Sequence, residues 1–157
     1  MKLTLLQTGR TTEKYLIEGI NNYHERIKKY VSFEIQTIPE IKNTKNMPIN
    51  EQKAKEGEKI AELCNNDDYI LLLDEKGKEF DTMEFARYLE KSFLLRKKRI
   101  VFVIGGPWGF SDEIYKRSDS SLSLSKMTFS HQVVRLLFME QLYRALSVIK
   151  GDPYHHV

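Results

Sequence analysis

The stretch VFVIGGPWGF, residues 101–110, decides the fold class of this chain. Four apolar residues run directly into two glycines, a pattern typical of a buried strand that ends in a turn almost without side chains. A second apolar run, YILLL at 69–73, ends in the same way at Asp74. Strands that are apolar on both faces are buried on both faces, so helices are expected to cover each side of the sheet.

Helical and strand patterns alternate along the rest of the chain. Further strands are expected at 2–8, 32–38 and 121–125, and helices at 12–29, 51–64, 131–150, after Asp81 or Thr82, and after Ser111. Asn50 is expected to cap the second helix, and Gly151 to end the last one. The alternation predicts an α/β fold with a mainly parallel sheet and helices on both faces. Its length, 1–157, predicts a single domain.

The composition is that of a soluble globular protein, with 41% hydrophobic and 30% charged residues. No apolar run reaches the roughly 18 residues of a membrane span, and the first residues read as a strand, not a signal peptide. Cys64 is the one cysteine, so no internal disulfide is expected and a reducing cytoplasm fits. The sequence contains neither CxxC nor HExxH, so no metal site is expected.

The net charge of +3 is a weak indication of nucleic-acid binding. The densest basic run is Arg96–Arg99. It has two interpretations: cations at the C-terminus of a helix, facing the negative end of its dipole, or a patch that contacts phosphates.

The last helix, 131–150, has apolar residues at nearly every angle around its axis. A helix that is apolar all round is buried all round. The domain can cover one face, and a second copy of the chain is expected to cover the other, because a two-fold dimer is the default assembly. The alternative is a helix buried within the monomer. Glu140 and Arg144 are spaced to form an i,i+4 ion pair.

Ligands of an open parallel sheet bind beyond the carboxyl ends of its strands. Three such ends stand out, at 73–77, 105–109 and 124–129. They carry neither GxGxxG nor GxxxxGK[ST], so dinucleotide and Walker-type sites are weak hypotheses. The bare Gly105-Gly106 mouth would admit a flat ligand close to the backbone, although a tight turn without a ligand is the alternative.

The C-terminal tail, DPYHHV at 152–157, also has two interpretations. Most chain ends are solvated and without function. Here Pro153 stiffens the approach, and Tyr154 with His155 offers a stacking surface beside a group that titrates near neutral pH.

Two long segments carry a resemblance to a known family: IGGPWGFS at 104–111 and SLSLSKMTFSHQVVRLLFMEQLYRALSVIKGDPYHHV at 121–157. Together with MKLTLLQTG at 1–9 and LDEKGKEFDT at 73–82, they resemble the bacterial ribosomal large-subunit pseudouridine methyltransferase H family of the SPOUT class. The resemblance spans the whole chain. It implies a C-terminal trefoil knot, which the strand pattern alone does not predict and general rules of chain topology disfavour.

The same resemblance implies an enzyme that uses S-adenosyl-L-methionine to methylate N3 of a pseudouridine in a stem-loop of 23S large-subunit rRNA. It implies a homodimer that acts in the cytoplasm on the assembled ribosome, with neither metal nor membrane. The cofactor-binding residues carried over from the family lie on the three strand ends described above: Leu73, Gly105, Leu124, Ser125, Lys126, Met127, Thr128 and Phe129.

The chemistry of this methyl transfer suggests catalytic residues on the last helix and the tail, where the Tyr154-His155 ending matches the family. His155 is expected to place or deprotonate the target base, Arg144 to support the anionic base or a phosphate, and Tyr154 to stack on the base. Arg144 could equally be a structural partner of Glu140. The usual basic ending is replaced here by His156-Val157.

Two rival functions remain at this point. One is a SPOUT enzyme that acts on tRNA, and the other is a non-catalytic RNA-binding or ribosome-assembly factor with the same fold. Trp108 has three possible roles: it could shield the cofactor, meet a partner subunit or face the RNA.

Overall fold

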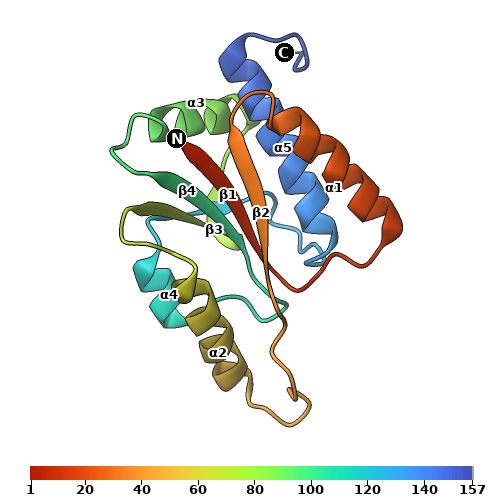
Figure 1. The fold of residues 1–157 in the computed structure, drawn as a ribbon, viewed down its shortest axis with the longest axis vertical. Helices are drawn as coiled ribbons and strands as arrows, with labels where there is room; N and C mark the ends of the chain where they lie inside the picture. Colours follow the sequence, from red (N-terminus) through yellow and green to blue (C-terminus); the bar gives the residue numbers. More distant parts are fainter. Residues whose placement is uncertain (157) are drawn as a thin grey trace.

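The computed structural model describes residues 1–156, in which five strands alternate with five helices (Figure 1). The elements are β1 (Lys2–Thr8), α1 (Lys14–Ile27), β2 (Ser32–Ile38), α2 (Ile49–Glu62), β3 (Asp68–Glu79), α3 (Thr82–Ser92), β4 (Arg99–Ile104), α4 (Asp112–Arg117), β5 (Ser120–Ser123) and α5 (Val133–Lys150). The strands form one sheet in the order β2-β1-β4-β3-β5, and every pair is parallel. The predicted α/β class is confirmed.

Helices cover both faces of the sheet, as the two apolar strands predict. Side chains of α1, α3 and α5 form one core with one face of the sheet, and side chains of α2 and α4 form a second core with the other. The central strand β4 shows why both are needed: Phe102 points into the first core, where its ring lies 4.9 Å from that of Phe138, while Val101 and Val103 point into the second.

Local capping signals explain where α3 and α4 begin and where α5 ends. Asp81 caps α3 in a capping box with Glu84, and the hydroxyl of Ser111 accepts the N–H of Ile114 at the start of α4. Gly151 ends α5 in the left-handed conformation. The prediction for Asn50 is wrong, because α2 begins at Ile49, directly after a proline whose fixed φ favours a helix start.

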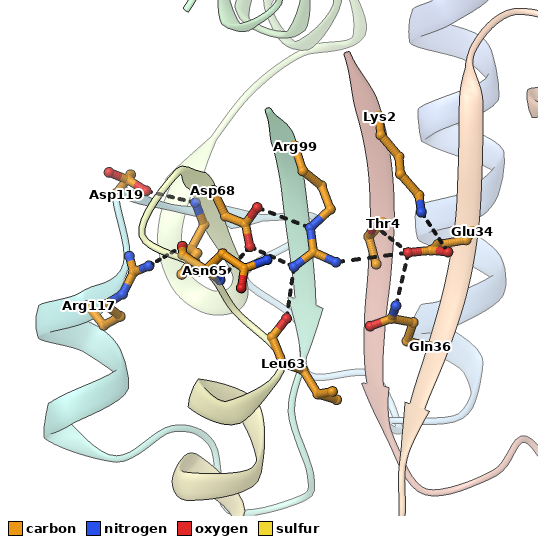
Figure 2. A network of polar contacts seen from close by, with 11 residues as sticks. Lys2, Thr4, Glu34, Gln36, Leu63, Asn65, Asp68, Arg99, Arg117 and Asp119 are labelled. Carbon is orange, nitrogen blue, oxygen red and sulfur yellow. Dashed lines mark hydrogen bonds and ion pairs between the residues drawn. The ribbon is translucent and has the colours of Figure 1, made fainter. Parts of the chain in front are cut away.

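A polar network holds the amino ends of the strands together (Figure 2). The Arg99 guanidinium donates to both carboxylate oxygens of buried Asp68, at 3.1 and 2.6 Å, and to the carbonyl of Leu63 at 2.8 Å. Burial opposes ionisation of Asp68, but hydrogen bonds from Arg99 and from the Asn65 backbone outweigh it, so the pKa of Asp68 lies below its ordinary value. The network therefore ties β3 to β4.

This network corrects the interpretation of the basic run. α3 ends at Ser92, so residues 96–99 lie beyond its last turn and in the connection to β4. Arg99 is the first residue of β4 and forms an ion pair with Asp68. Lys98 is mostly exposed, and its Nζ lies 3.3 Å from Oδ2 of Asp67. A phosphate contact stays a prediction for Arg96, Lys97 and Lys98 only.

At the carboxyl edge, β3 is interrupted opposite β5. Leu122 pairs with both Leu73 and Lys78, so residues 74–77 loop out of the strand. A Cβ on Gly77 would lie 2.8 Å from backbone atoms of Leu122, so only glycine allows the backbones of β3 and β5 to approach this closely. The trefoil knot implied by the family resemblance stays a prediction.

One side of α5 is covered by its own chain, chiefly by α1 and α3, and seven of its 18 residues are buried. One side remains half-exposed or exposed, and we call it the α5 outer stripe: Val133, Leu137, Glu140, Gln141, Arg144 and Val148. Leu137, at 37% exposure, is the most open apolar side chain of the stripe. A partner subunit over this stripe stays a prediction. No helix within residues 1–156 is long and apolar enough to cross a membrane.

Candidate functional site

A cavity of about 500 Å³ lies at the carboxyl edge of the sheet, beside the ends of β4 and β5 and the irregular part of β3. Three segments form most of its wall: residues 73–76 of β3, the glycine loop 105–110 after β4, and the β5–α5 loop. Lys53 of α2 and Tyr115 of α4 add polar groups, and Val134 closes the side next to α5. Three strand ends that are far apart in the sequence thus meet at one site, as predicted for a parallel sheet.

Seven of the eight predicted cofactor residues line this cavity: Leu73, Gly105, Leu124, Ser125, Met127, Thr128 and Phe129. Lys126 does not, and its side chain is almost fully exposed, 4.0 Å from Glu79. The reason is local, because the Ser125 hydroxyl accepts the N–H of Met127 at 2.9 Å and closes a tight turn with Lys126 at its tip.

Hydrogen bonds between the segments hold the wall together. The Thr128 hydroxyl donates to Glu75 at 2.6 Å, which ties the β5–α5 loop to the irregular part of β3. The Tyr115 hydroxyl donates to Asp74 across the rim. Burial and this carboxylate together raise the pKa of Tyr115, so its hydroxyl stays protonated as a donor.

The structure shows a second reason for the bare glycine loop, beside the predicted approach of a ligand. A Cβ on Gly105 would lie 2.9 Å from the ring of Phe110, and a Cβ on Gly106 would lie 2.7 Å from Glu56 Oε2. A side chain at either position would displace the side chain that packs against the loop there. Gly109 has φ +80°, which favours glycine on its own. Trp108 lines the cavity and is 51% exposed at its mouth.

The three predicted catalytic residues form one cluster at the C-terminal part of α5. Arg144 donates twice to Glu140 Oε1, at 2.9 and 2.6 Å, and its guanidinium lies 4.7 Å from the centre of the Tyr154 ring. Arg144 Nη1 lies 3.2 Å from Nδ1 of His155. A guanidinium only donates, so Nδ1 accepts and the proton of the neutral imidazole is placed on Nε2.

Tyr154 anchors the tail to this cluster. Its hydroxyl donates to Glu140 at 3.3 Å, and its ring lies edge-on to Tyr143, with centres 4.6 Å apart. The neighbouring hydroxyl of Tyr23 and burial raise the pKa of Tyr154 to about 12. Hydrogen bonds to Glu140 likewise raise the pKa of Arg144. The predicted Glu140–Arg144 pair is therefore present.

The catalytic cluster and the cavity do not meet within one chain. None of Arg144, Tyr154 and His155 lines the cavity. Val134 lies at the cavity and Arg144 follows ten residues later, which is about 15 Å along the helix axis. In Figure 1 the C-terminal tail lies at the end of the molecule where the strands begin. The cavity is lined by residues at the opposite, carboxyl edge of the sheet.

Two charged residues of this region were not predicted. Glu56 of α2 is buried against the glycine loop, and Arg135 of α5 is fully buried. Arg135 donates to the Thr8 carbonyl at 2.6 Å and to the Thr11 hydroxyl at 3.0 Å, and burial lowers its pKa. A charged residue on the core-facing side of an amphipathic helix is the signal that could have identified both.

Comparisons with known proteins identify the family of this chain. A family model described as "Predicted SPOUT methyltransferase" matches residues 1–155. Curated relatives named "Ribosomal RNA large subunit methyltransferase H" are 51% identical in Parabacteroides distasonis, 53% in Phocaeicola vulgatus and 46% in Flavobacterium johnsoniae. Each alignment spans 156 residues and 99% of both chains.

A solved structure, the SpoU methyltransferase AviRb from Streptomyces viridochromogenes in complex with AdoMet, aligns over 96% of this chain and 59% of its own. Its TM-score is 0.47 at 13% identity, a likeness too distant to support an argument. The family match and the relatives, which cover nearly the whole sequence, are decisive: this chain belongs to the SPOUT methyltransferase family.

Proposed function

We propose that this protein is an S-adenosyl-L-methionine-dependent methyltransferase that methylates N3 of a pseudouridine in a stem-loop of 23S large-subunit rRNA. The observation that supports it best is the identity of about half of all residues, over 99% of both chains, to relatives named as ribosomal RNA large subunit methyltransferases H. The pseudouridine and its N3 atom come from the family resemblance and are the finer part of the proposal.

The cavity suits S-adenosylmethionine in size and in chemistry. Its volume of about 500 Å³ lies in the range of small-molecule sites. Leu73, Leu124 and Phe129 give it an apolar wall for a flat ring, while Asp74 and Glu75 place carboxylates at the rim. Apolar surface and nearby carboxylates favour a ligand that combines an aromatic base with positively charged groups.

When bound, S-adenosylmethionine supplies a methyl group activated by its positively charged sulfur, so the protein's main task is alignment. Holding the nucleophile in line with that methyl group contributes roughly 7–11 kcal/mol. The nucleophile, N3 of the base, must also lose its proton, and a positioned base or a cation beside the anion contributes about 10²–10⁴-fold in rate.

The tail cluster has the groups for this second task. Arg144 is a permanent cation fixed by Glu140, so it can stabilise an anionic base without being displaced. Nε2 of His155 carries the ring proton in the observed pairing, so His155 donates a hydrogen bond to the base and positions it. For His155 to accept the N3 proton instead, the imidazole must exchange tautomers or release Arg144. The Tyr154 ring offers a surface for stacking, worth about 1–3 kcal/mol.

The separation of tail and cavity supports a homodimer. Because the groups that activate the base lie about 15 Å from the cavity along α5, one chain does not place them at a bound methyl donor. The α5 outer stripe contains Glu140 and Arg144 and includes the exposed Leu137. A second copy packed in the opposite direction along this stripe would bring its own tail toward the first cavity.

Two measurements test the proposed function. Calorimetry of the purified protein with S-adenosylmethionine is expected to show binding, and no heat would favour the non-catalytic RNA-binding alternative. Mass mapping of large-subunit rRNA from a strain that lacks this protein is expected to show one pseudouridine without its methyl group. An unchanged methylation state would overturn the substrate, and a missing methyl on a tRNA would favour the tRNA enzyme.

A further inference from the structure

Glu56 is a buried carboxylate that the chemistry above does not use. It lies on α2, with 7% of the residue exposed. A carboxylate is costly to bury unless hydrogen bonds satisfy it. Its Oε1 accepts the backbone N–H of Gly106 at 2.8 Å and the hydroxyl of Thr8 at 3.3 Å. Burial raises the pKa of Glu56 above its ordinary value, and the hydrogen bonds from Gly106 and Thr8 offset only part of that rise.

The two donors lie at the carboxyl ends of neighbouring strands. Thr8 is the last residue of β1, Gly106 follows β4, and β1 pairs with β4. The Gly106 residue also lines the cavity, whereas Glu56 does not. Glu56 therefore contacts the cavity wall from the side away from the cavity, through its hydrogen bond to the backbone N–H of Gly106.

Helix α2 also contacts the far end of the same loop. A Cβ on Gly57 would lie 2.6 Å from the hydroxyl oxygen of Ser111 and 3.1 Å from Ile114, so α2 packs as closely as a glycine allows. Within the loop, the Gly106 carbonyl accepts the N–H of Gly109 at 3.3 Å. Glu56 therefore holds the loop at Gly106, and the next residue of α2, Gly57, packs against Ser111 just beyond the end of the loop.

The charge of Glu56 selects one orientation of the peptide between Gly105 and Gly106. In a trans peptide the carbonyl and the following N–H point in opposite directions. An ionised carboxylate only accepts, so it binds the Gly106 N–H and repels the Gly105 carbonyl. Two adjacent glycines otherwise let this peptide flip at little cost, because neither has a Cβ. A flip would turn the Gly105 carbonyl toward Glu56 and the Gly106 N–H away from it, so the loop would present a donor to the cavity where it now presents an acceptor.

We propose that Glu56 is a positioning residue of the candidate cofactor site, which holds the Gly105–Gly106 peptide in one orientation so that the loop forms a fixed wall for S-adenosylmethionine. The inference rests on the proposed function, because it assumes the same ligand in the cavity. Glu56 itself does not line the cavity, and the inference requires its carboxylate to be ionised.

Two substitutions of Glu56 test separately whether its hydrogen bond to Gly106 matters and whether residue 56 must be a pure acceptor. Glu56→Ala removes the acceptor and is expected to weaken S-adenosylmethionine binding about 10- to 100-fold, as for the loss of a hydrogen bond to a charged group. Glu56→Gln keeps the shape and an acceptor but adds an amide donor that tolerates the flipped peptide. It is expected to weaken binding about 3- to 10-fold with an unchanged melting temperature.

The matched control is Glu58→Gln, which makes the same charge change at an exposed position of the same helix. Affinity is measured by calorimetry, and loop order by acrylamide quenching of Trp108, the one tryptophan of the chain, in protein without cofactor. We expect Glu56→Ala and Glu56→Gln to increase quenching, and Glu58→Gln to match the wild type in both measurements.

The outcomes distinguish this inference from the proposed function. If the wild-type protein does not bind S-adenosylmethionine, the proposed function fails. If the wild type binds it and both Glu56 variants bind as tightly as Glu58→Gln, with unchanged quenching, Glu56 has no positioning role and the inference is wrong. A KM for the cofactor that rises in Glu56→Gln at constant kcat would support it, because the residue acts on binding alone.

Discussion

The buried pair of Asp68 and Arg99 shows how a single residue ties strands together at the amino edge. Asp68 is buried at the first position of β3, and Arg99 at the first position of β4 reaches it with two hydrogen bonds. Removing one member of a buried pair leaves the other charge without a partner. Asp68→Asn is therefore expected to lower the free energy of unfolding by about 3 kcal/mol at pH 7, measured by urea denaturation.

The pH dependence of this variant follows from the lowered pKa of Asp68. A carboxyl whose pKa is lower in the folded state stabilises the fold above its unfolded pKa, and that stability is lost as the pH falls through the folded pKa. The difference between wild type and Asp68→Asn should thus shrink as the pH drops below about 4. A difference that stays constant down to pH 2 would contradict the assignment.

Two residues of the β5–α5 loop, Lys126 and Thr128, lie close together in the sequence but differ in whether they contact the cavity. Lys126 points into solvent, whereas Thr128 lines the cavity and donates to Glu75. Lys126→Ala is expected to leave S-adenosylmethionine affinity within about twofold, because it removes an exposed charge. Thr128→Val keeps the shape, breaks the tie to Glu75 and should weaken binding about 5- to 10-fold. Calorimetry on both variants is the measurement, and equal losses would contradict the assigned geometry.

Among the elements, those with strong local patterns were predictable from the sequence. β4 and the start of β3 appear as continuous apolar runs, and Asp81, Ser111 and Gly151 carry cap signals that depend only on their neighbours. The contact of Glu56 with Gly106 joins residues 50 positions apart and leaves no local pattern. Such contacts depend on how α2 packs on the sheet, which the periodicity of α2 does not specify.

The C-terminal tail is an element without regular structure that the sequence could place only in part. Residues 154 and 155 were identified through the family resemblance, but their return to Glu140 and Arg144 depends on aromatic contacts with α1 and α5. The roles of the candidate site residues stay predictions, and the sequence did not predict that these residues lie in two separate groups.

Removal of residues 154–157 tests this division. Asp152 is retained because its N–H caps α5 by donating to the Ser147 carbonyl. No residue from 154 to 156 lines the cavity, so S-adenosylmethionine affinity should stay within about fivefold of the wild type. rRNA methylation should fall at least about 100-fold, because the groups that activate the base are lost. Calorimetry and methyl transfer to rRNA give the two readouts. A truncated protein that methylates at the full rate would remove Tyr154 and His155 from the mechanism.

For the whole molecule, the α5 outer stripe is the surface most suited to a second copy. Leu137→Glu places a charge at its exposed apolar position and is expected to shift the protein from dimer to monomer in sedimentation velocity, without loss of the monomer's own fold. rRNA methylation should fall together with the dimer fraction. The control is Leu94→Glu, at an apolar side chain that is also exposed but lies beyond α3. A wild-type protein that sediments as a monomer at micromolar concentration would contradict the dimer.

A mixing experiment decides whether tail and cavity act in the same chain or across two. Leu124→Arg would block the cavity and leave the tail intact, whereas the chain without residues 154–157 keeps the cavity and lacks the tail. Each variant alone should be inactive. If the tail of one subunit serves the cavity of the other, each mixed dimer contains one complete site. Random exchange then restores about a quarter of the wild-type activity, since half of the dimers are mixed and each has one of two sites. If both groups act within one chain, every chain in the mixture is defective and mixing restores nothing. The Leu137→Glu substitution in both variants should abolish the recovery, because it prevents the subunits from pairing.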